Sequence, residues 1–200
     1  MSPRATPNAA PQARRADARR NIECILDAAL EELAEDQEAS MATIARRAGV
    51  VRATLYVHFP TREALIAAVT ERAIADSSEA IRAATPDEGE PREALRRILT
   101  TAWRTLGRYH ALVAINARLD PIRLRSLHEP VLGLVRPVLE RGQASGAFDP
   151  DLPLDWMLTV VLELIHAASR AVSAGRLPEG AAERALVATV TGALSPPTCA

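Results

Sequence analysis

The residues with the most suggestive chemistry lie within positions 40–59. Arg52, Thr54 and Tyr56 fall within five consecutive positions, and no acidic residue occurs between positions 46 and 62. A guanidinium group can donate two parallel hydrogen bonds to the O6 and N7 atoms of a guanine base. A surface without carboxylates also suits close approach to phosphate groups. These residue types therefore indicate contact with duplex DNA, with Arg52 as the best candidate for reading a base.

A second pattern with possible chemistry is Glu163-x-x-His166, the spacing found in helical di-iron sites. Such a site needs this pair twice and two further carboxylates, and the sequence holds the pair once. Glu163, His166 and Arg170 share one face of a predicted helix, where an ion-pair cluster is expected instead. Because Gly-rich phosphate loops, nucleophile elbows and paired-cysteine motifs are also missing, we expect no enzyme activity, metal or cofactor. Stoichiometric bound iron would favour the enzyme alternative.

Two short helices joined by a tight turn must position the acid-free stretch. Ser40 can cap the first helix, and Gly49 suits the left-handed backbone conformation that ends it. The second helix is expected over about 51–58, because the residue before Pro60 avoids the α conformation. Ala45 provides a small contact where the two helices cross. This arrangement predicts a helix-turn-helix, whose second helix presents its outer side chains to a major groove.

Hydrophobic periodicity predicts helices along the rest of the chain. Ile25 and Ala29 lie on one face of a first helix that starts near Asp17. Further helices are predicted from Thr61, from Pro91, around 109–119, over 124–143, over 154–174 and over 179–194. Pro130 and Pro137 are expected to disturb the segment 124–143. Since β-branched residues do not alternate convincingly with polar ones, the predicted fold class is all-α with about nine helices.

Several constrained residue types occur at fixed spacing in the helix-turn-helix. They are Ile44-Ala45, Ala48-Gly49-Val50, Thr54-Leu55-Tyr56 and His58-Phe59, followed by Glu63 and Leu65. This run closely resembles the signature of the tetracycline-repressor (TetR) family of transcriptional regulators, and Ile25-Leu26 with Ala28-Ala29 matches the family's first helix. The resemblance covers roughly residues 20–66. Beyond it, the likeness is limited to the helix pattern and the segment 146–152.

The resemblance implies a set of DNA-contacting residues. They are Thr43, Arg52, Ala53, Thr54, Tyr56, His58 and Arg62. The three residues that begin the recognition helix, Arg52, Ala53 and Thr54, would read bases, and the other four would contact phosphate groups. Arg62 stands where the family usually has lysine, and Asp36-Gln37 where a glycine is common. Val51 replaces the usual Ser or Thr cap of the recognition helix.

The resemblance and the helix pattern predict four regions. They are a flexible basic arm (1–16), a helix-turn-helix DNA-binding domain (17–66), a ligand-binding and dimerisation domain (67–194) and a tail (195–200). Paired DNA half-sites require a dimer. The helices over 154–174 and 179–194 carry more apolar surface than one monomer core readily covers, so they are the expected dimer interface. The resemblance implies a homodimeric repressor of a palindromic double-stranded operator, released by a small-molecule effector.

The effector pocket is expected among the middle helices, because ligand pockets are mostly apolar with a few polar groups. Its candidate lining residues are Trp103, Leu106, Tyr109, His110, Trp156 and His166. The identity of the effector, the operator sequence and the direction of regulation stay open. The role of the basic arm also stays open between phosphate binding and an idle leader.

Composition is consistent with a soluble globular regulator. The 200 residues carry a net charge of −1, and all 24 basic residues are arginine. Residues 1–20 hold five of these arginines and one acid, so the basic charge is clustered. Two cysteines, no leader and no apolar run long enough for a bilayer indicate a cytoplasmic protein without membrane contact. An interaction-only helical protein is the remaining alternative, and failure to bind any DNA at low salt would favour it.

Overall fold

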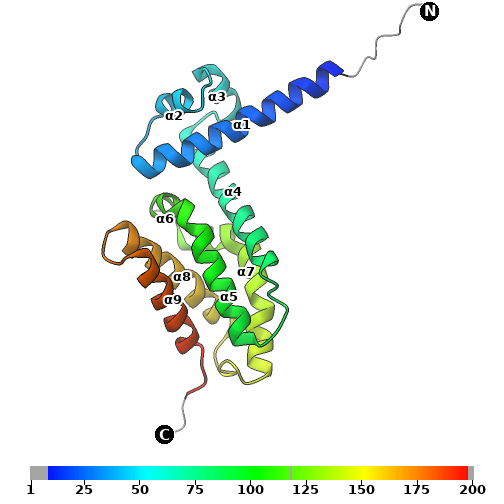
Figure 1. The fold of residues 1–200 in the computed structure, drawn as a ribbon, viewed down its shortest axis with the longest axis vertical. Helices are drawn as coiled ribbons and strands as arrows, with labels where there is room; N and C mark the ends of the chain where they lie inside the picture. The colour runs from blue at the N-terminus through cyan, green and yellow to red at the C-terminus, as the bar shows by residue number, and fades with distance from the viewer. Residues whose placement is uncertain (1–8, 118, 198–200) are drawn as a thin grey trace, which may run out of the picture. The chain divides into compact units, whose positions relative to one another are not determined.

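The computed structural model of the chain is built from α-helices, which confirms the predicted fold class (Figure 1). The structure describes residues 9–117 and 119–197, and within them it contains nine α-helices, one 3-10 helix and no strand. The first helices are α1 (Ala9–Glu35), α2 (Met41–Arg47), α3 (Arg52–His58) and α4 (Arg62–Ala83). They are followed by α5 (Pro91–Leu106), η1 (Gly107–Tyr109), α6 (His110–Asn116), α7 (Pro121–Ala144), α8 (Leu154–Ser173) and α9 (Glu179–Ala193).

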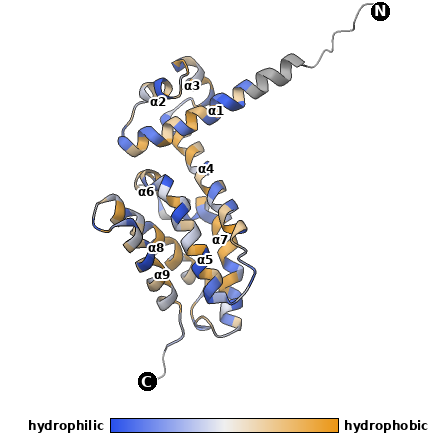
Figure 2. Cartoon of the chain, viewed as in Figure 1, coloured by the Kyte–Doolittle hydropathy of each residue, from blue (hydrophilic) through white to orange (hydrophobic). Residues whose placement is uncertain are grey.

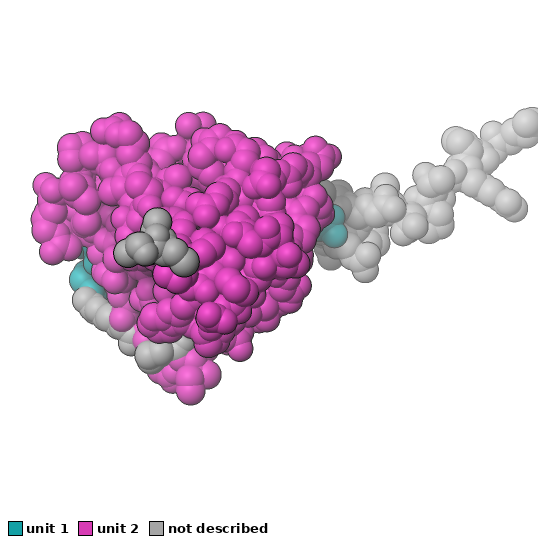
Figure 3. All heavy atoms as spheres, turned by 90° about the horizontal axis from the view of Figure 1, so that it is seen from below, with its two compact units in different colours: residues 1–69 teal, residues 70–200 magenta. Residues whose placement is uncertain are grey.

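The chain divides into two compact units, residues 1–69 and 70–200, which are coloured separately in Figure 3. Helix α4 is continuous and contributes its first eight residues to the first unit and the remainder to the second. None of the helices in residues 9–117 and 119–197 combines the length and the apolar character needed to cross a membrane.

The expectation of a flexible arm over 1–16 requires correction for its second half. Helix α1 already begins at Ala9, whereas residues 1–8 lie outside the described residues. Pro11 falls in the first turn, where a helix needs no backbone N–H donor, so it does not interrupt the helix. Ala, Gln and Arg, which dominate the next positions, are strong helix formers. The helix can therefore start earlier than hydrophobic periodicity alone indicates.

The first unit has a small core made by one face of α1 and the inner faces of α2 and α3. Ile25, Ala29 and Leu33 are spaced by four residues along α1, and all three are fully buried. Ile44 of α2 and Leu55 of α3 are equally buried. Because burial of each large aliphatic side chain stabilises by about 1.5–3 kcal/mol, this packing can fix two short helices that would not be stable alone.

An ion-pair cluster also holds α2 on α1. The guanidinium group of Arg47 donates from Nε to Glu32 at 2.6 Å, from Nη2 to Glu35 at 2.8 Å and from Nη1 to Glu31 at 3.2 Å. These carboxylates lie at spacings of one, three and four residues, so they face α2 together. The hydrogen bonds to Glu35, with those to Glu32 and Glu31, raise the pKa of Arg47 above its usual value. Arg47 is thus a structural residue whose charge is neutralised locally.

The second unit packs its helices around a larger core. Leu95, Ile98 and Leu99 of α5 are buried against Met157 and Leu158 of α8, and Figure 2 colours the apolar residues of these helices orange. Residues from α7 and α9 complete the same cluster. The near-continuous apolar character of α8 follows from this central position.

Helix α7 is continuous, although the sequence analysis expected two prolines to disturb it. Pro130 and Pro137 are both exposed, so the missing N–H groups and the local distortion fall on the side of the helix that faces solvent. On the opposite side, Leu132, Val135 and Val138 are buried in the core. Burial of this face outweighs the cost of the two prolines, which is about 3 kcal/mol each in a helix interior.

The segment after α7 turns sharply and closes one end of the core. Gly146 has φ +72°, a left-handed conformation that glycine adopts without steric cost. The turn places Phe148 fully inside the core, directly over Gly142, and the Phe148 N–H donates to the Gly142 carbonyl at 3.0 Å. The Asp149 N–H donates to the carbonyl of Leu194 at 2.9 Å, which fastens the end of α9 to this turn.

Candidate DNA-binding surface and internal cavity

Helices α2 and α3 form the expected helix-turn-helix. The Ser40 side chain caps α2 by accepting a hydrogen bond from the Thr43 N–H at 3.2 Å, and Gly49 has φ +67° in the turn. Val51 stands at the N-cap of α3 and, having no side-chain acceptor, provides no cap hydrogen bond. The Phe59 N–H donates to the carbonyl of Leu55 at 2.8 Å, and the helix ends there, before Pro60.

The outer face of α3 is exposed and carries no carboxylate. Leu55 points into the core, whereas Tyr56 is 48% exposed and Val57 is 78% exposed. Arg52 and Ala53, at the start of the helix, are also exposed, and Thr54 is half-buried. The side chains of Arg52, Tyr56 and Val57 are therefore accessible to a binding partner.

The structure places the other predicted contact residues around this helix. Thr43 lies in the first turn of α2, where its hydroxyl group is 2.9 Å from the Ser40 hydroxyl. His58, in the last turn of α3, is half-buried, and its ring centroid is 6.4 Å from that of Phe59.

Arg62 differs from the expectation. Its guanidinium group donates from Nη2 to the carbonyl of Gln37 and from Nε to the carbonyl of Ala39, the latter at 3.5 Å. It therefore fastens the loop between α1 and α2 to the start of α4. A planar guanidinium can reach two carbonyls at once, which a lysine ammonium group does less well. We therefore assign Arg62 to the loop and omit it from the proposed DNA contacts.

A shallow concave surface between α2 and α3 adds a residue that the sequence analysis did not include. Ser40, Thr43, Arg46 and Arg52 line it, and both arginines are exposed. Arg46 belongs to the same acid-free segment as Arg52, so its charge could have marked it as a candidate DNA contact from the sequence alone. Since Arg47 and Arg62 are engaged by carboxylates and carbonyls, Arg46 and Arg52 provide the outward positive charge of this surface.

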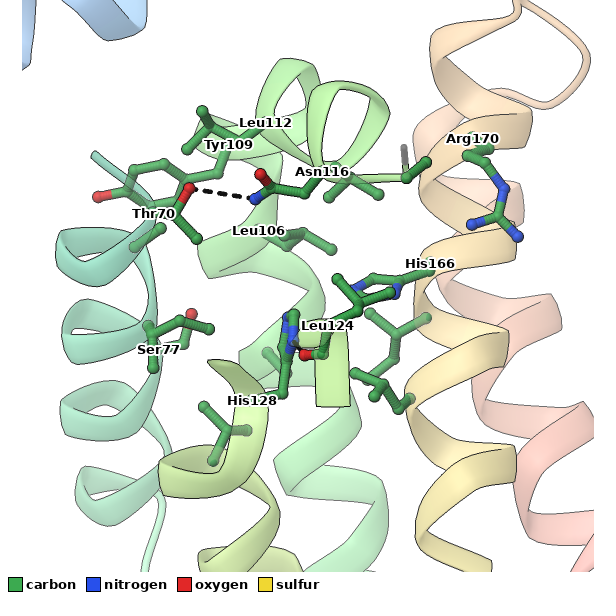
Figure 4. Close-up of a pocket in the computed structure, with 18 residues that line it drawn as sticks. Thr70, Ser77, Leu106, Tyr109, Leu112, Asn116, Leu124, His128, His166 and Arg170 are labelled. Atoms are coloured by element: carbon green, nitrogen blue, oxygen red, sulfur yellow. Dashed lines mark hydrogen bonds between the residues drawn. The ribbon is translucent and has the colours of Figure 1, made fainter. Parts of the chain in front are cut away.

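The second unit contains an internal cavity of about 90 Å³ (Figure 4). Helices α4, α5, α6, α7 and α8 and the 3-10 turn line it. Three of the six predicted lining residues, Leu106, Tyr109 and His166, border this cavity.

The other three predicted residues lie elsewhere. Trp103 is fully buried in the core, with its ring centroid 5.5 Å from that of His110. His110 Nδ1 lies 2.7 Å from the Ser169 hydroxyl, which directs its ring away from the cavity lining. Trp156 is 56% exposed near the start of α8. Residue type alone did not separate lining, core and surface aromatics, because all three occur on amphipathic helices.

Most of the polar lining residues were not among those predicted from the sequence. Thr70, Ser77, Asn116, His128 and Arg170 all border the cavity. The Asn116 side-chain amide donates to the Thr70 hydroxyl at 3.1 Å, a hydrogen bond drawn in Figure 4. Thr70 and Asn116 are 46 residues apart in sequence. Asn116 and His110 are the two polar residues of α6, and this polarity in a mostly apolar helix was the signal that pointed to Asn116.

Two histidines lie next to each other in the cavity, His128 of α7 and His166 of α8. Their ring centroids are 4.8 Å apart with an edge-to-face arrangement, and Figure 4 shows both rings among the lining side chains. His128 Nδ1 donates to the carbonyl of Leu124 at 2.8 Å, so its Nε2 atom is left as an acceptor when the ring is neutral. Burial lowers the pKa of His128. Burial also lowers the pKa of His166, to about 4, and the nearby His128 and Arg170 contribute to this shift. Both rings are therefore neutral at pH 7.

Tyr109 contributes its ring to the cavity but directs its hydroxyl group elsewhere. The hydroxyl donates a hydrogen bond to the carboxylate of Asp76 on α4, and Figure 4 shows the oxygen pointing away from the other lining residues. Burial and this carboxylate raise the pKa of Tyr109 to about 12. The pair fixes the position of α4 relative to the 3-10 turn within the second unit.

Acid should destabilise the protein through His166. Its pKa is about 4 in the folded chain against an ordinary value of 6.5, so the unfolded chain takes up this proton first as the pH falls. The contribution to stability is complete above about pH 6.5 and is lost as the pH falls towards 4. Between pH 7 and pH 5 we expect a loss of about 2 kcal/mol from this group. Urea unfolding should show a correspondingly smaller loss in His166→Gln, and equal losses in both proteins would contradict the assignment.

The fold and the α2–α3 geometry define a helix-turn-helix protein. A model of the bacterial regulatory proteins of the tetR family matches residues 25–69, from the buried face of α1 into α4. Over these residues the chain is similar to this family, in agreement with the sequence motif.

Two curated repressors are similar to parts of the chain. The HTH-type transcriptional repressor NicS of Pseudomonas putida is 27% identical over 122 residues, 56% of this chain and 57% of that protein. The HTH-type transcriptional repressor LfrR of Mycolicibacterium smegmatis is 38% identical over 80 residues, 40% of this chain and 42% of that protein. The chain thus spans about half the length of the curated relatives that it matches.

Solved structures extend the likeness over most of the chain. The TetR-like regulator LfrR from Mycobacterium smegmatis, in complex with proflavine, has a TM-score of 0.68 and 27% identity and covers 88% of this chain and 97% of its own. The fatty acid degradation regulator FadR from Bacillus halodurans has a TM-score of 0.72 and 18% identity, and the match covers 86% of this chain and 98% of that chain. At this identity the likeness shows the shared fold alone. These proteins are regulators rather than enzymes.

The side chains of Glu163 and His166 lie in different environments. His166 is buried in the cavity, whereas Glu163 is exposed. The expected ion-pair cluster with Arg170 does not form among the described residues, because Glu163 and Arg170 are nearly two turns apart and make no salt bridge there. Within the same part of the chain, no group of three or more metal-ligating side chains comes together.

Proposed function

We propose that the protein is a homodimeric transcriptional repressor that binds a palindromic DNA operator and is released by a small-molecule effector. The observation that carries the proposal is the exposed, carboxylate-free face of α3, held on a helix-turn-helix that matches the tetR family model over residues 25–69. Arg52, Ala53 and Thr54 would read bases, and Thr43, Arg46, Tyr56 and His58 would contact the backbone.

Recovery of genomic fragments bound by the purified full-length chain tests this proposal. Fragments that share a palindromic sequence with half-sites about 34–36 Å apart are the expected result. Failure to bind any DNA at low salt would contradict it and favour an interaction-only protein.

Operator binding should weaken steeply with salt. Each charged phosphate contact releases counterions, and Arg46 supplies one such contact per unit, or two in a dimer. Affinity should then fall by about threefold to fourfold for each doubling of the salt concentration. A fluorescence anisotropy titration at several salt concentrations measures this slope. A flat response would show that this surface does not bind phosphate groups.

The proposed effector response uses α4. Thr70, Ala73, Ile74 and Ser77 of this helix line the cavity, and the same helix begins in the first unit. A ligand that binds the cavity more tightly when α4 takes one of two positions would increase the population of that position. Because α4 also begins in the first unit, the preferred placement of the first unit would change with it. The effector would then favour a separation of the two DNA-binding units that does not fit successive major grooves. The complex of the similar regulator LfrR with proflavine supports a small-molecule response.

The proposed dimer interface lies on α8 and α9. A shallow groove between these helices is lined by Leu164, Leu177 and Leu186 and by small residues such as Ala167 and Ala185. Small side chains allow helices of a second copy to approach closely, and packing the two pairs together as a four-helix bundle would cover the groove.

Ala185→Arg should convert the dimer into a monomer. Ala185 is exposed on α9 and lines the groove, so a long charged side chain there would be buried without a partner in the dimer. Light scattering coupled to size-exclusion chromatography measures the molar mass. Ala144→Arg, at the exposed C-terminal end of α7, adds the same charge elsewhere and should leave the mass unchanged. Equal masses for the two variants would place the interface on another face.

A further inference from the structure

We infer that the cavity of the second unit selects a compact apolar monocarboxylate, whose carboxylate group pairs with Arg170 at the rim. The inference rests on the proposed function, because it names the class of effector for the same cavity. It is carried by the charge, the size and the polar groups of the lining.

The charge of the lining is one-sided. Of the eighteen described residues that line the cavity, Arg170 is the one with a formal charge at pH 7, and none is an aspartate or glutamate. Asp76 accepts the Tyr109 hydroxyl outside the lining, and Glu163 is exposed to solvent. A cationic ligand would therefore find no counter-charge among these residues, whereas an anion would find one.

Arg170 is placed to receive that anion. It is exposed at the rim, one turn after His166 on α8, and within the described residues it makes no salt bridge. Figure 4 shows its side chain close to His166. A guanidinium group can donate two parallel hydrogen bonds to a carboxylate, which is a strong and directional pairing.

The rest of the lining fits an apolar group with limited polarity. Leu106 of α5, Val113 of α6, and Leu162 and Ile165 of α8 supply apolar contacts from three helices. The neutral rings of His128 and His166 can accept or donate single hydrogen bonds without contributing charge. A phosphate or a second carboxylate would leave negative charge among these groups without a partner.

The volume limits the size of the ligand. The cavity of about 90 Å³ is smaller than the cavity of about 150 Å³ that accommodates benzene and far smaller than the roughly 300 Å³ typical of drug-sized ligands. Because the carboxylate would lie at the rim, the cavity needs to enclose the apolar part alone. A short branched chain comes nearest to this limit, and a single ring requires the cavity to widen towards its open rim.

Three probes of matched shape test the inference by isothermal titration calorimetry on the full-length chain: phenylacetate, phenylacetamide and phenethylamine. They are an anion, a neutral amide and a cation on the same ring. Phenylacetate should bind about tenfold or more tightly than either of the others, as expected for a charge-assisted pair. Tighter binding of the amine, or no binding of any probe at millimolar concentration, would overturn the assignment.

Charge reversal at the rim gives the second arm of the test. Arg170→Glu should invert the order, so that phenethylamine binds more tightly than phenylacetate, while the exposed side chain leaves the fold intact. Arg176→Glu changes the same charge at an exposed position just beyond α8 that does not line the cavity, and it should keep the original order. An unchanged order in Arg170→Glu would overturn the inference.

A DNA-binding measurement separates this inference from the proposed function. If the chain binds its operator but prefers the amine or ignores Arg170, the ligand class is wrong and the repressor proposal stands. If phenylacetate binds in the expected order but the chain binds no DNA, the proposed function fails and the cavity assignment stands.

Discussion

Arg52→Glu should lower operator affinity by about 100-fold or more. The change removes a guanidinium that can pair with a guanine, which is worth about 1–3 kcal/mol. It also brings a carboxylate to a surface that must approach phosphate groups, where like charges cost several kcal/mol. Arg52 is exposed in the first turn of α3, so a glutamate there should leave the fold intact. Anisotropy titration on a recovered operator measures the change.

Two companion variants make the result specific. Arg123→Glu introduces the same change in net charge in the first turn of α7, in the second unit, and operator affinity should stay within about twofold. Arg52→Ala separates base reading from phosphate contact. A larger loss on the operator than on random DNA indicates base reading, and equal losses indicate a phosphate contact. An Arg52→Glu protein with wild-type affinity would rule out α3 as the DNA-binding helix.

Gly142→Ala should be the most destabilising glycine-to-alanine change in the second unit. A Cβ atom at this position would lie 1.9 Å from Cδ2 of Phe148, far inside any permitted contact distance. Phe148 is fully buried, and its backbone is hydrogen-bonded to Gly142, so the ring cannot move aside without opening the turn. We expect a loss of about 3 kcal/mol or more, at the upper end for overpacked cores. Urea unfolding followed by circular dichroism measures it.

Gly133→Ala is the matched control on the same helix. A Cβ atom there meets no other atom within 4 Å, and Gly133 is exposed with ordinary helical geometry. Alanine is favoured over glycine in helices by up to about 1 kcal/mol, so this variant should be slightly more stable. Similar losses in both variants would show that the space above Gly142 is not filled by Phe148.

Helix type and the position of the recognition helix could be read from local sequence signals. Ser40, Gly49 and Pro60 mark where α2 begins and where α2 and α3 end through their own backbone preferences, which act over a few residues. The alternation of buried Leu55 with exposed Tyr56 follows from helical geometry alone. These features need no information about distant parts of the chain.

The boundaries that failed were those where a local rule competed with packing. Pro130 and Pro137 were expected to disturb α7, but the buried face of that helix keeps it continuous. Towards the N-terminus, α1 starts before its apolar period begins, because alanine, glutamine and arginine are strong helix formers.

For this protein, the sequence by itself determined the all-helical class, the helix-turn-helix and the acid-free stretch around Arg52. Each depends on backbone preference or on neighbours a few positions away. Only the tertiary structure decided which arginines face outward, because Arg47 and Arg62 are engaged by groups 12 to 25 residues away. It also decided that His128 and His166 share a cavity while Trp156 faces solvent, since five helices must pack before a cavity has walls.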